Sequence, residues 1–319
     1  MAKQGWDEAA RALAAAETVA VCCHVAPDGD ALGSMLGLGG FLMRQGKTVH
    51  MSWGSPTTKA PPQYGFMPGL DQVIASAEVP DVLDVFVAID CGDNSRLESL
   101  KDRFDSAKTT INIDHHISND SFADINIVDP DRASSCELAF ELIKRMDGDV
   151  EAQEALCLYT GIVTDTGRFQ YSNASPATLR AAAELRDLGL DHEKVSAEIY
   201  ESNSFAYLRV LGIVLSRASL EEGFVWSWVD QADLSGVDLD ETEHFIDALR
   251  AVREARVAAI LKQQPEGGYK VSLRSKGDVD VAAIAKGLGG GGHARAAGYS
   301  STAPIHSVIA TLKSRIAKA

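Results

Sequence analysis

The sequence predicts an α/β fold with a larger first domain built on a mostly parallel sheet and a smaller second domain. Apolar runs at residues 18–23, 48–52, 85–89 and 109–113 have the length and composition of buried strands. Helical patterns, such as the one over residues 31–45, lie between them. Strands that alternate with helices form parallel sheets with both faces covered. The first domain is therefore expected to hold such a sheet.

The remaining elements complete two domains. Residues 133 to about 190 have helical patterns, and residues 191–218 predict a helical connection. FVWSWV and RVAAILKQQ then read as strands, and YKVSLRS pairs with the latter across PEGG. A helix over 280–286, a glycine run, a strand over 296–300 and a helix from Pro304 follow. The predicted domains are 1–190 and 219–319.

Composition indicates a soluble globular protein. Of the 319 residues, 45% are hydrophobic and 24% charged, which is enough for two cores. No stretch approaches the ~20 apolar residues of a membrane span. The N-terminal MAKQGWDEAARALAAA predicts an amphipathic helix and lacks the layout of a signal peptide. Five cysteines without a C-x-x-C pair favour reduced thiols and a cytoplasmic location.

The net charge of −15 is unevenly distributed. Residues 1–204 hold 32 acidic and 16 basic side chains, whereas residues 205–319 hold 13 and 14. A negative field repels long duplexes, whose capture depends on extended basic surface. A small phosphorylated substrate held at one local site is compatible with this charge.

Candidate metal ligands occur in four short clusters, each after an apolar run. They are His24, Asp28 and Asp30 in HVAPDGD, Asp90 in VFVAID, His115 in INIDHH, and Asp165 in LYTGIVTD. In parallel sheets, ligands gather beyond the carboxyl ends of the strands. Four carboxylates brought together there would raise one another's pKa. Two divalent cations would remove that repulsion and supply phosphoester-cleaving chemistry.

Each cluster taken alone has a structural alternative. Asp28 or Asp30 could cap the helix that follows, and Asp90 could be an ordinary turn residue. Asp165 could lie at a helix end closed by Gly167. The recurrence of four clusters at strand or helix ends favours the metal site over these alternatives.

Two adjacent imidazoles follow Asp114. Because neighbouring side chains diverge, only one of His115 and His116 can easily face the metals. The other is expected to hydrogen-bond a carboxylate or to meet substrate. Mixed carboxylate and imidazole ligands suit Mn²⁺ better than Ca²⁺ or an all-cysteine Zn²⁺ site.

A glycine run marks the second domain, GGGGHARAAG over residues 289–298. Its formal G-x-G-x-x-G match follows a predicted helix instead of a strand, and no G-K-[ST] is present, so neither a dinucleotide fold nor a P-loop is predicted. The structural alternative is that the glycine run is a flexible linker. The backbone amides of Gly291 and Gly292, with His293 and the guanidinium of Arg295, would instead form an anion cradle.

These five motifs, in this order over nearly the whole chain, resemble the DHH phosphoesterases with a DHH-associated C-terminal domain, and in particular their bacterial nanoRNase and pAp-phosphatase group. The resemblance implies a bilobal fold with its active site in the cleft. It implies Mn²⁺-dependent hydrolysis, with Mg²⁺ or Co²⁺ as substitutes, of nanoRNA to mononucleotides and of 3′-phosphoadenosine 5′-phosphate (pAp) to AMP. The expected partners are short single-stranded oligonucleotides and small nucleotides, not long duplexes or membranes.

The resemblance also implies residue roles. One metal would be held by His24, Asp28, Asp90 and Asp165, and the other by Asp30, Asp90, His115 and Asp165. His116 would touch substrate, while His293 and Arg295 would grip a terminal phosphate. The expected mechanism is in-line attack by a hydroxide bridging two metals, with His116 or His293 protonating the leaving group. Cys136 stands where the family more often has threonine, which should affect packing more than catalysis.

Other functions stay open. The same metal ligands could hydrolyse pyrophosphate or polyphosphate, and cleavage of linear dinucleotides overlaps with the main prediction. A nucleotide-binding sensor without turnover is a different class, which the complete ligand set argues against. An apolar helix face on the first domain would allow a homodimer.

Overall fold

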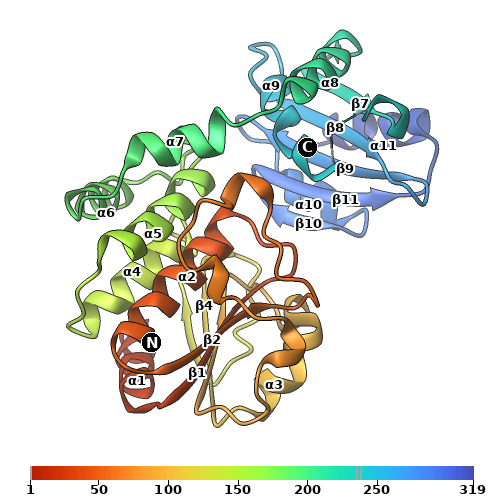
Figure 1. Cartoon of the computed structure of the whole chain (residues 1–319). Coiled ribbons are helices and arrows are strands. Elements are labelled where there is room, and N and C mark those ends of the chain that lie inside the picture. The colour runs from red at the N-terminus through yellow and green to blue at the C-terminus, as the bar shows by residue number, and fades with distance from the viewer. Residues whose placement is uncertain (1, 235, 238) are drawn as a thin grey trace. The chain divides into compact units, whose positions relative to one another are not determined.

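The computed structural model describes residues 2–234, 236–237 and 239–319 of the chain. The fold divides into two compact units, Met1–Ser202 and Asn203–Ala319 (Figure 1). This boundary falls inside the segment 191–218 predicted to connect two domains. Among the described residues, no helix combines the length and the apolar character needed to cross a membrane.

A five-stranded, all-parallel sheet forms the centre of the first unit, with strand order β2-β1-β3-β4-β5. The strands are β1 (Thr18–Cys23), β2 (Thr48–Trp53), β3 (Val85–Ile89), β4 (Thr109–Asp114) and β5 (Ile125–Val128). The helices are α1 (Ala2–Ala15), α2 (Gly29–Arg44), α3 (Lys101–Ser106), α4 (Ser135–Arg145), α5 (Ala152–Asp165), α6 (Pro176–Asp187) and α7 (His192–Tyr200). The predicted parallel sheet is confirmed. Strand β5 was missed because its four residues follow a turn-rich segment and pair only with the distant β4.

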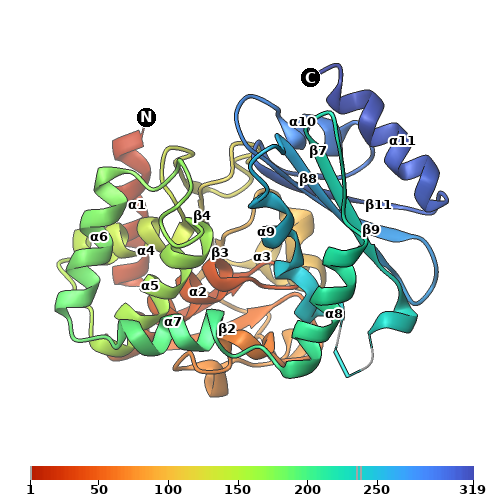
Figure 2. The ribbon, with the colours of Figure 1, turned by 90° about the horizontal axis from the view of Figure 1, so that it is seen from above.

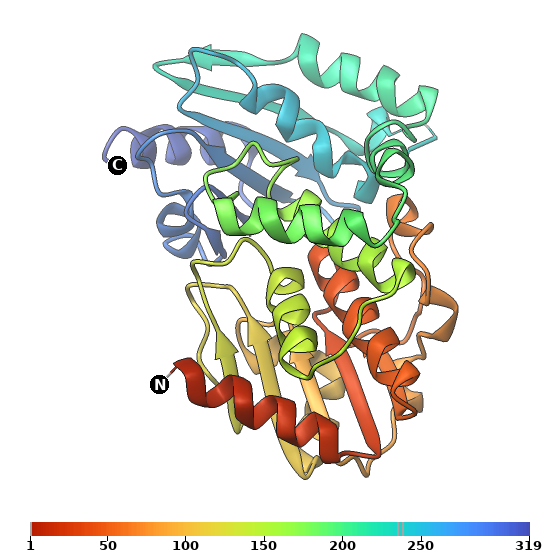
Figure 3. The ribbon, with the colours of Figure 1, turned by 90° about the vertical axis from the view of Figure 1, so that its left-hand side faces the viewer.

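Both faces of this sheet are buried, as the apolar strands predict. Val19 and Val21 of β1 belong to the core formed with α1, α2, α4 and α5. The alternate residues Ala20 and Cys22 pack on the other face, in a smaller core that includes Phe104 of α3. Figure 3 shows α1 lying along one face of the strands. Helical cover on both faces leaves the ends of the strands as the place for polar chemistry.

Asp84 ties the start of β1 to the start of β3. Its Oδ2 accepts hydrogen bonds from the backbone N–H groups of Glu17 and Thr18, both at 3.0 Å, and its Oδ1 accepts one from Lys108 Nζ at 2.8 Å. The Lys108 bond, followed by the backbone bonds, holds the pKa of Asp84 well below its usual value. Such a carboxylate stabilises the folded state above its ordinary pKa, and this contribution is lost as the pH falls toward the folded pKa.

Replacing Asp84 with asparagine is therefore expected to lower the free energy of unfolding at neutral pH. The difference from the wild type should shrink as the pH falls below about 4. At that pH Asp84 becomes protonated in the unfolded wild type, so the stabilising contribution of its charged form declines. Urea unfolding over this pH range measures the effect, with Asp71→Asn as the control at an exposed carboxylate. An equal loss at neutral and acidic pH would contradict the assignment.

The second unit has a mixed six-stranded sheet with the order β10-β11-β9-β8-β7-β6. Its strands are β6 (Ser219–Glu221), β7 (Phe224–Val229), β8 (Val257–Gln263), β9 (Tyr269–Ser275), β10 (Gly291–His293) and β11 (Ala296–Ser301). Its helices are α8 (Phe205–Ser216), α9 (Phe245–Arg250), α10 (Val281–Lys286) and α11 (Ile305–Ile316). Helices α8 and α9 cover one face and α10 and α11 the other (Figure 2). The predicted smaller α/β domain and the hairpin between β8 and β9 are confirmed.

Candidate active site and metal centre

The order of the parallel strands predicts where a ligand site lies in the first unit. Strands β1 and β3 are neighbours, but the chain leaves them toward opposite sides of the sheet order, with β2 on one side and β4 on the other. Ligand sites of open α/β sheets lie at such a reversal point, outside the carboxyl ends of the strands. His24 directly follows β1 and Asp90 directly follows β3, so both lie at this position.

His24 and Asp90 approach each other at the end of β1 and β3. The imidazole Nε2 lies 3.5 Å from Asp90 Oδ2, and both side chains are buried. The Nδ1–H of His24 donates to the carbonyl of Val25 at 2.8 Å, which orients the ring with Nε2 toward Asp90. Asp90 has a φ of 57°, a left-handed conformation that aspartate tolerates better than most residues. Such strain is typical of functional sites.

Asp28 caps a helix, and it also lies in a grouping that could hold a metal ion. Its Oδ1 caps α2 by accepting hydrogen bonds from the N–H groups of Asp30 and Ala31 at 3.1 and 3.0 Å. A carboxylate oxygen of Asp28 also lies within 4.8 Å of ligand atoms of His24 and Asp90, a grouping suited to a metal ion. The cap and the ligand role are compatible because a carboxylate has two oxygens.

The Asp30 carboxylate is buried and accepts hydrogen bonds from the N-terminus of α4. Its Oδ2 accepts from the Ser135 N–H at 2.7 Å, and its Oδ1 from the Cys136 N–H at 2.9 Å. The Ser135 hydroxyl donates to Asp90 Oδ1 at 3.0 Å, so one residue orients both carboxylates. The sequence analysis missed this role of Ser135. The signal was available, because Ser134-x-x-Glu137 marks a helix start and helix N-termini favour anions.

The His115 imidazole lies among three carboxylates. Its Nε2 is 3.7 Å from Asp30 Oδ2, 3.8 Å from Asp90 Oδ1 and 3.7 Å from Asp165 Oδ2. These distances are too long for hydrogen bonds. Ligand atoms of Asp30, Asp90 and His115 lie within 4.8 Å of one another, a grouping that could hold a metal ion.

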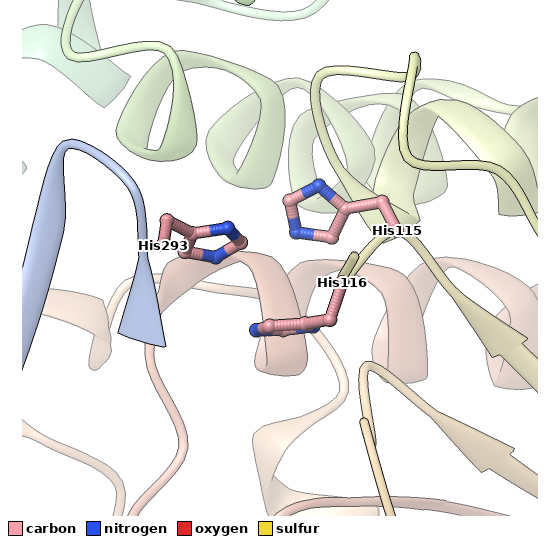
Figure 4. Close-up of side chains that lie close together, drawn as sticks. All are labelled: His115, His116 and His293. Carbon is pink, nitrogen blue, oxygen red and sulfur yellow. The ribbon is translucent and has the colours of Figure 1, made fainter. Parts of the chain in front are cut away.

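The second imidazole makes the carboxylate contact expected of it. His116 Nδ1 lies 2.6 Å from Asp114 Oδ1, and Figure 4 shows the rings of His115 and His116 leaving the chain in different directions. Asp114 is fully buried and also accepts a 2.6 Å hydrogen bond from Asn119 Nδ2. Asn119 was not singled out from the sequence, since nothing in a single asparagine marks the pairing. This chain of bonds fixes the orientation of His116.

Asp165 is the last residue of α5, and an unusual loop follows it. Gly167, Arg168 and Phe169 all have positive φ, between 53° and 62°, a strained run for two side-chain-bearing residues. The Asn173 side chain donates to the Asp165 carbonyl at 3.1 Å. The predicted helix end with Gly167 is therefore present, and the same helix end carries the Asp165 carboxylate toward His115.

Close packing of α2, α4 and α5 brings these ligands together. A Cβ on Gly161 of α5 would lie 2.2 Å from Cys136 Sγ and 2.9 Å from the Asp30 Cα, so only glycine fits there. Cys136 thus fills the gap between the three helices, and its thiol donates a hydrogen bond to the Asp30 carbonyl, with 3.5 Å between Sγ and the oxygen. The predicted packing role of Cys136 agrees with these contacts. Its pKa is raised well above the usual value by burial, which keeps it a thiol.

The electrostatics of the site require counter-charge. Burial, followed by the nearby Asp90, raises the pKa of Asp30 well above its usual range. Burial alone would also raise the pKa of Asp90, but His24 and His116 hold it low. Burial would lower the pKa of His116, but the Asp114 hydrogen bond and Asp90 raise it to about 10. Two groupings, His24 with Asp28 and Asp90, and Asp30 with Asp90 and His115, have the donor chemistry and spacing to hold a divalent cation.

Replacing Ser135 with alanine is expected to lower the metal affinity or the turnover about 10- to 100-fold. Side chains that hydrogen-bond metal ligands orient those ligands, and their loss typically has an effect of this size. The backbone bond to Asp30 would remain, and only the 3.0 Å hydroxyl bond to Asp90 would be lost. Isothermal titration with metal and steady-state rates measure the effect. Ser34→Ala is the matched control, a buried serine whose hydroxyl bonds backbone carbonyls of α2. Equal effects of the two substitutions would contradict the role of Ser135.

In the second unit, the glycine run is partly a strand, which was not predicted from the sequence and which excludes a purely flexible linker there. Gly291, Gly292 and His293 form β10, which pairs antiparallel with β11 (Figure 4 shows His293 on β10). Glycine is required because a Cβ on Gly292, whose φ is 133°, would lie 2.5 Å from the Ala296 carbonyl. Arg295 lies exposed in the hairpin turn that follows. As an edge strand, β10 keeps one row of backbone groups without a strand neighbour in the described chain, as the anion cradle needs.

The first unit holds groupings of side chains that could bind metal, and the family comparisons identify the class of protein as a hydrolase. The DHH family, N-terminal domain, matches residues 18–162, and the DHHA1 domain matches residues 228–318. The chain belongs to the DHH family and is a phosphoesterase.

Individual relatives narrow the comparison further. The "Bifunctional oligoribonuclease and PAP phosphatase NrnA" of Thermus thermophilus is 34% identical over 87% of this chain and 82% of its own length. The Bacillus subtilis protein of the same name is 28% identical over 92% of each chain. A solved structure of an exopolyphosphatase-related protein from Bacteroides fragilis has 27% identity and a TM-score of 0.91, covering 99% of this chain and 96% of that one.

Proposed function

We propose that the protein hydrolyses nanoRNA to mononucleotides and pAp to AMP. The observation that carries this proposal is the placement of His115 Nε2 at 3.7 to 3.8 Å from three carboxylates, a cluster whose mutual repulsion bound divalent cations would offset. The relatives named as oligoribonuclease and PAP phosphatase support the choice of substrate.

Two Mn²⁺ ions are the proposed cofactors, with Mg²⁺ or Co²⁺ as substitutes. His24, Asp28, Asp90 and Asp165 would hold one ion, and Asp30, Asp90, His115 and Asp165 the other. Bound divalent cations lower the pKa of water and offset charge on phosphoryl oxygens, which are the two needs of an in-line hydrolysis. Mixed imidazole and carboxylate donors suit Mn²⁺.

The protein groups around the ligands have separate tasks. Asp114 Oδ1 accepts a hydrogen bond from the Nδ1–H of His116, and this contact orients the His116 ring. His116 can therefore hold a proton at Nε2 and deliver it to the leaving oxygen, with His293 as the alternative donor. Ser135 and the α4 N-terminus keep the Asp30 and Asp90 carboxylates in place while substrate binds.

Substrate recognition is assigned to the β10 hairpin. Gly291, Gly292, His293 and Arg295 would bind a terminal phosphate through backbone N–H groups, imidazole and guanidinium. The proposed domains are 1–190, with the candidate metal ligands, and 219–319, with the β10 hairpin, joined by the segment 191–218. The proposed substrates are short single strands and not long duplexes or membranes. Five buried free cysteines favour the reducing cytoplasm.

Hydrolysis of polyphosphate or pyrophosphate is the second candidate, favoured by the name of the Bacteroides fragilis relative. The metal ligands would serve either reaction, since they meet mainly a phosphate. A nucleotide sensor without turnover is a third possibility, in which the same residues would bind pAp and release no product.

Product analysis separates these candidates. Purified protein with Mn²⁺ is offered 5′-labelled RNA di- to pentamers, pAp and pyrophosphate in parallel. The proposal expects mononucleotides from the RNAs and AMP from pAp. Orthophosphate from pyrophosphate alone would transfer the assignment to the second candidate, and tight pAp binding without product would support the sensor.

A further inference from the structure

Asn112 places a side-chain amide in the interior of the first sheet. It lies on β4, between β3 and β5, and is fully buried. Its neighbours Ile111 and Ile113 belong to the larger core, so the Asn112 side chain lies on the opposite face of the sheet. Asparagine is depleted in strands, and a buried amide is costly unless its polar groups find hydrogen-bond partners. Its presence here therefore calls for a physical explanation.

The two N–H groups of the Asn112 amide hold the backbone on either side of Asp90. Asn112 Nδ2 donates to the carbonyls of Ala88 and Cys91, both at 3.1 Å. On the backbone, the Asp90 N–H donates to the carbonyl of Ile113 at 2.9 Å. Asp90 has a φ of 57°, and a strained conformation of this kind persists only when the surrounding contacts impose it. Three hydrogen bonds to β4 therefore hold the turn that carries Asp90.

The oxygen of the same amide leads to His116. Asn112 Oδ1 accepts a hydrogen bond from Asn119 Nδ2 at 2.8 Å. Asn119 Nδ2 also donates to Asp114 Oδ2 at 2.6 Å, and Asp114 Oδ1 accepts from His116 Nδ1, likewise at 2.6 Å. The Cys91 carbonyl accepts from both amides, at 3.1 Å each. Both N–H groups and the oxygen of Asn112 are thus used, and the network joins the turn after β3 to His116.

We propose that Asn112 is a positioning residue that holds Asp90 and His116 in one fixed relative arrangement. Asp90 belongs to both groupings of metal donors described above, so the turn after β3 sets the geometry of both. Side chains that carry out catalysis need such support, because their own conformations must be fixed before substrate binds. The tasks of Asp90 as a metal ligand and of His116 as a proton donor rest on the proposed function.

The chemistry of the position requires asparagine. Two donors and one acceptor are needed at once, and an amide supplies all three. Serine has one donor and leucine has none. Aspartate has nearly the same shape, but its carboxylate oxygens would face the carbonyls of Ala88 and Cys91 without a proton to share. Substitution of Asn112 therefore removes the network even where it conserves the volume of the side chain.

Asn112→Ser tests the proposal, with Asn126→Ser as the matched control. Asn126 lies on β5, directly beside Asn112 in the strand register. Its amide also bonds backbone groups, the N–H and the carbonyl of Ala123, at 3.2 and 2.7 Å. Neither of these contacts involves the turn after β3 or His116. Calorimetric titration with Mn²⁺ in the absence of substrate, and steady-state kinetics on pAp, are carried out on both variants.

Asn112→Ser is expected to lower the Mn²⁺ affinity and kcat about 10- to 100-fold, the effect typical of groups that orient metal ligands. KM should change little, because the Asn112 side chain is fully buried and does not reach substrate. Asn126→Ser should leave the Mn²⁺ affinity, kcat and KM unchanged, although both variants should lose thermal stability. Wild-type Mn²⁺ affinity and kcat in Asn112→Ser, or equal losses in the two variants, would overturn the proposal.

Asn119 offers a second test, at a half-buried position in the loop after β4 where a substitution should not prevent folding. Asn119→Ser should lower the Mn²⁺ affinity as well as kcat, because Asn119 contacts the Asn112 amide and the Cys91 carbonyl. The double variant should lose little more than Asn112→Ser alone, since the two amides act in one network. Strictly additive losses would overturn the network. If Asn112→Ser does not fold, an unchanged Mn²⁺ affinity in Asn119→Ser overturns the proposal by itself.

Failure of the proposed function is separately observable. A wild type that binds Mn²⁺ but hydrolyses neither RNA nor pAp would remove the proposed function. The Mn²⁺ affinities of Asn112→Ser and Asn126→Ser would still decide the positioning role, because they are measured without substrate. A wild type that hydrolyses pAp, beside an Asn112→Ser variant with the same Mn²⁺ affinity and kcat, would remove the positioning role alone.

Discussion

Asp90→Asn is expected to abolish hydrolysis while leaving the fold intact. Asp90 lies at the junction of both groupings of metal donors, and it contacts His24, His115 and Ser135. In the proposed two-metal centre, loss of the shared anionic ligand should reduce turnover by about 10³-fold or more, which corresponds to about 4 kcal/mol of transition-state stabilisation. Steady-state rates on pAp and on an RNA dimer, at saturating Mn²⁺, measure the loss.

Asparagine is preferred to alanine for this test. The φ of 57° at Asp90 is tolerated by asparagine, and the Ser135 hydroxyl can still donate to its Oδ1. Asp90→Ala should lose the same activity but also about 1 kcal/mol of stability from backbone strain. Asp187→Asn, at an exposed position at the end of α6, controls for loss of a carboxylate. Near-normal turnover by Asp90→Asn with a native melting curve would refute the metal centre.

The position of the ligands could be predicted because it depends on local pattern. His24 and Asp90 each follow a short apolar strand, and parallel strands deliver their carboxyl ends to one edge. Asp165 was harder, because it ends a helix, and its approach to His115 depends on the packing of α5 against α2. That packing relies on Gly161 and Cys136. A Cβ added at Gly161 would lie 2.2 Å from Cys136 Sγ, and so close an approach cannot be predicted from the spacing of residues in the sequence.

Features formed by non-local pairing were missed for the same reason. Ser135 reaches Asp90 across 45 residues of sequence, and β5 exists through its pairing with β4. No strand was predicted within the glycine run, because β10 forms through its pairing with β11 and a strand of glycines has no periodic signal. Apolar periodicity shows that a helix has an apolar face but not what covers it.

Removing divalent cations is expected to inactivate the enzyme and to destabilise its first unit. Without cations, the carboxylates of Asp28, Asp30, Asp90 and Asp165 face one another in a mostly buried site, and the raised pKa of Asp30 reflects the cost of its charge there. A metal that binds only the folded state, at about 1,000 times its dissociation constant, adds about 4 kcal/mol of stability. For a unit of this size, that corresponds to a rise in melting temperature of roughly 8–15 °C.

The experiment compares chelated protein with protein reloaded with Mn²⁺, by calorimetry and by activity. Wild-type activity should return on reloading, and the melting temperature should rise with the metal concentration. Asp90→Asn should show little of this rise, whereas Asp187→Asn should show all of it, because only the former removes a donor. Since the second unit contributes none of these carboxylates, any separate transition from its own core should not move with metal. Full activity after exhaustive chelation, or equal metal-dependent stabilisation of both variants, would show that the His115 cluster is an ordinary buried polar network.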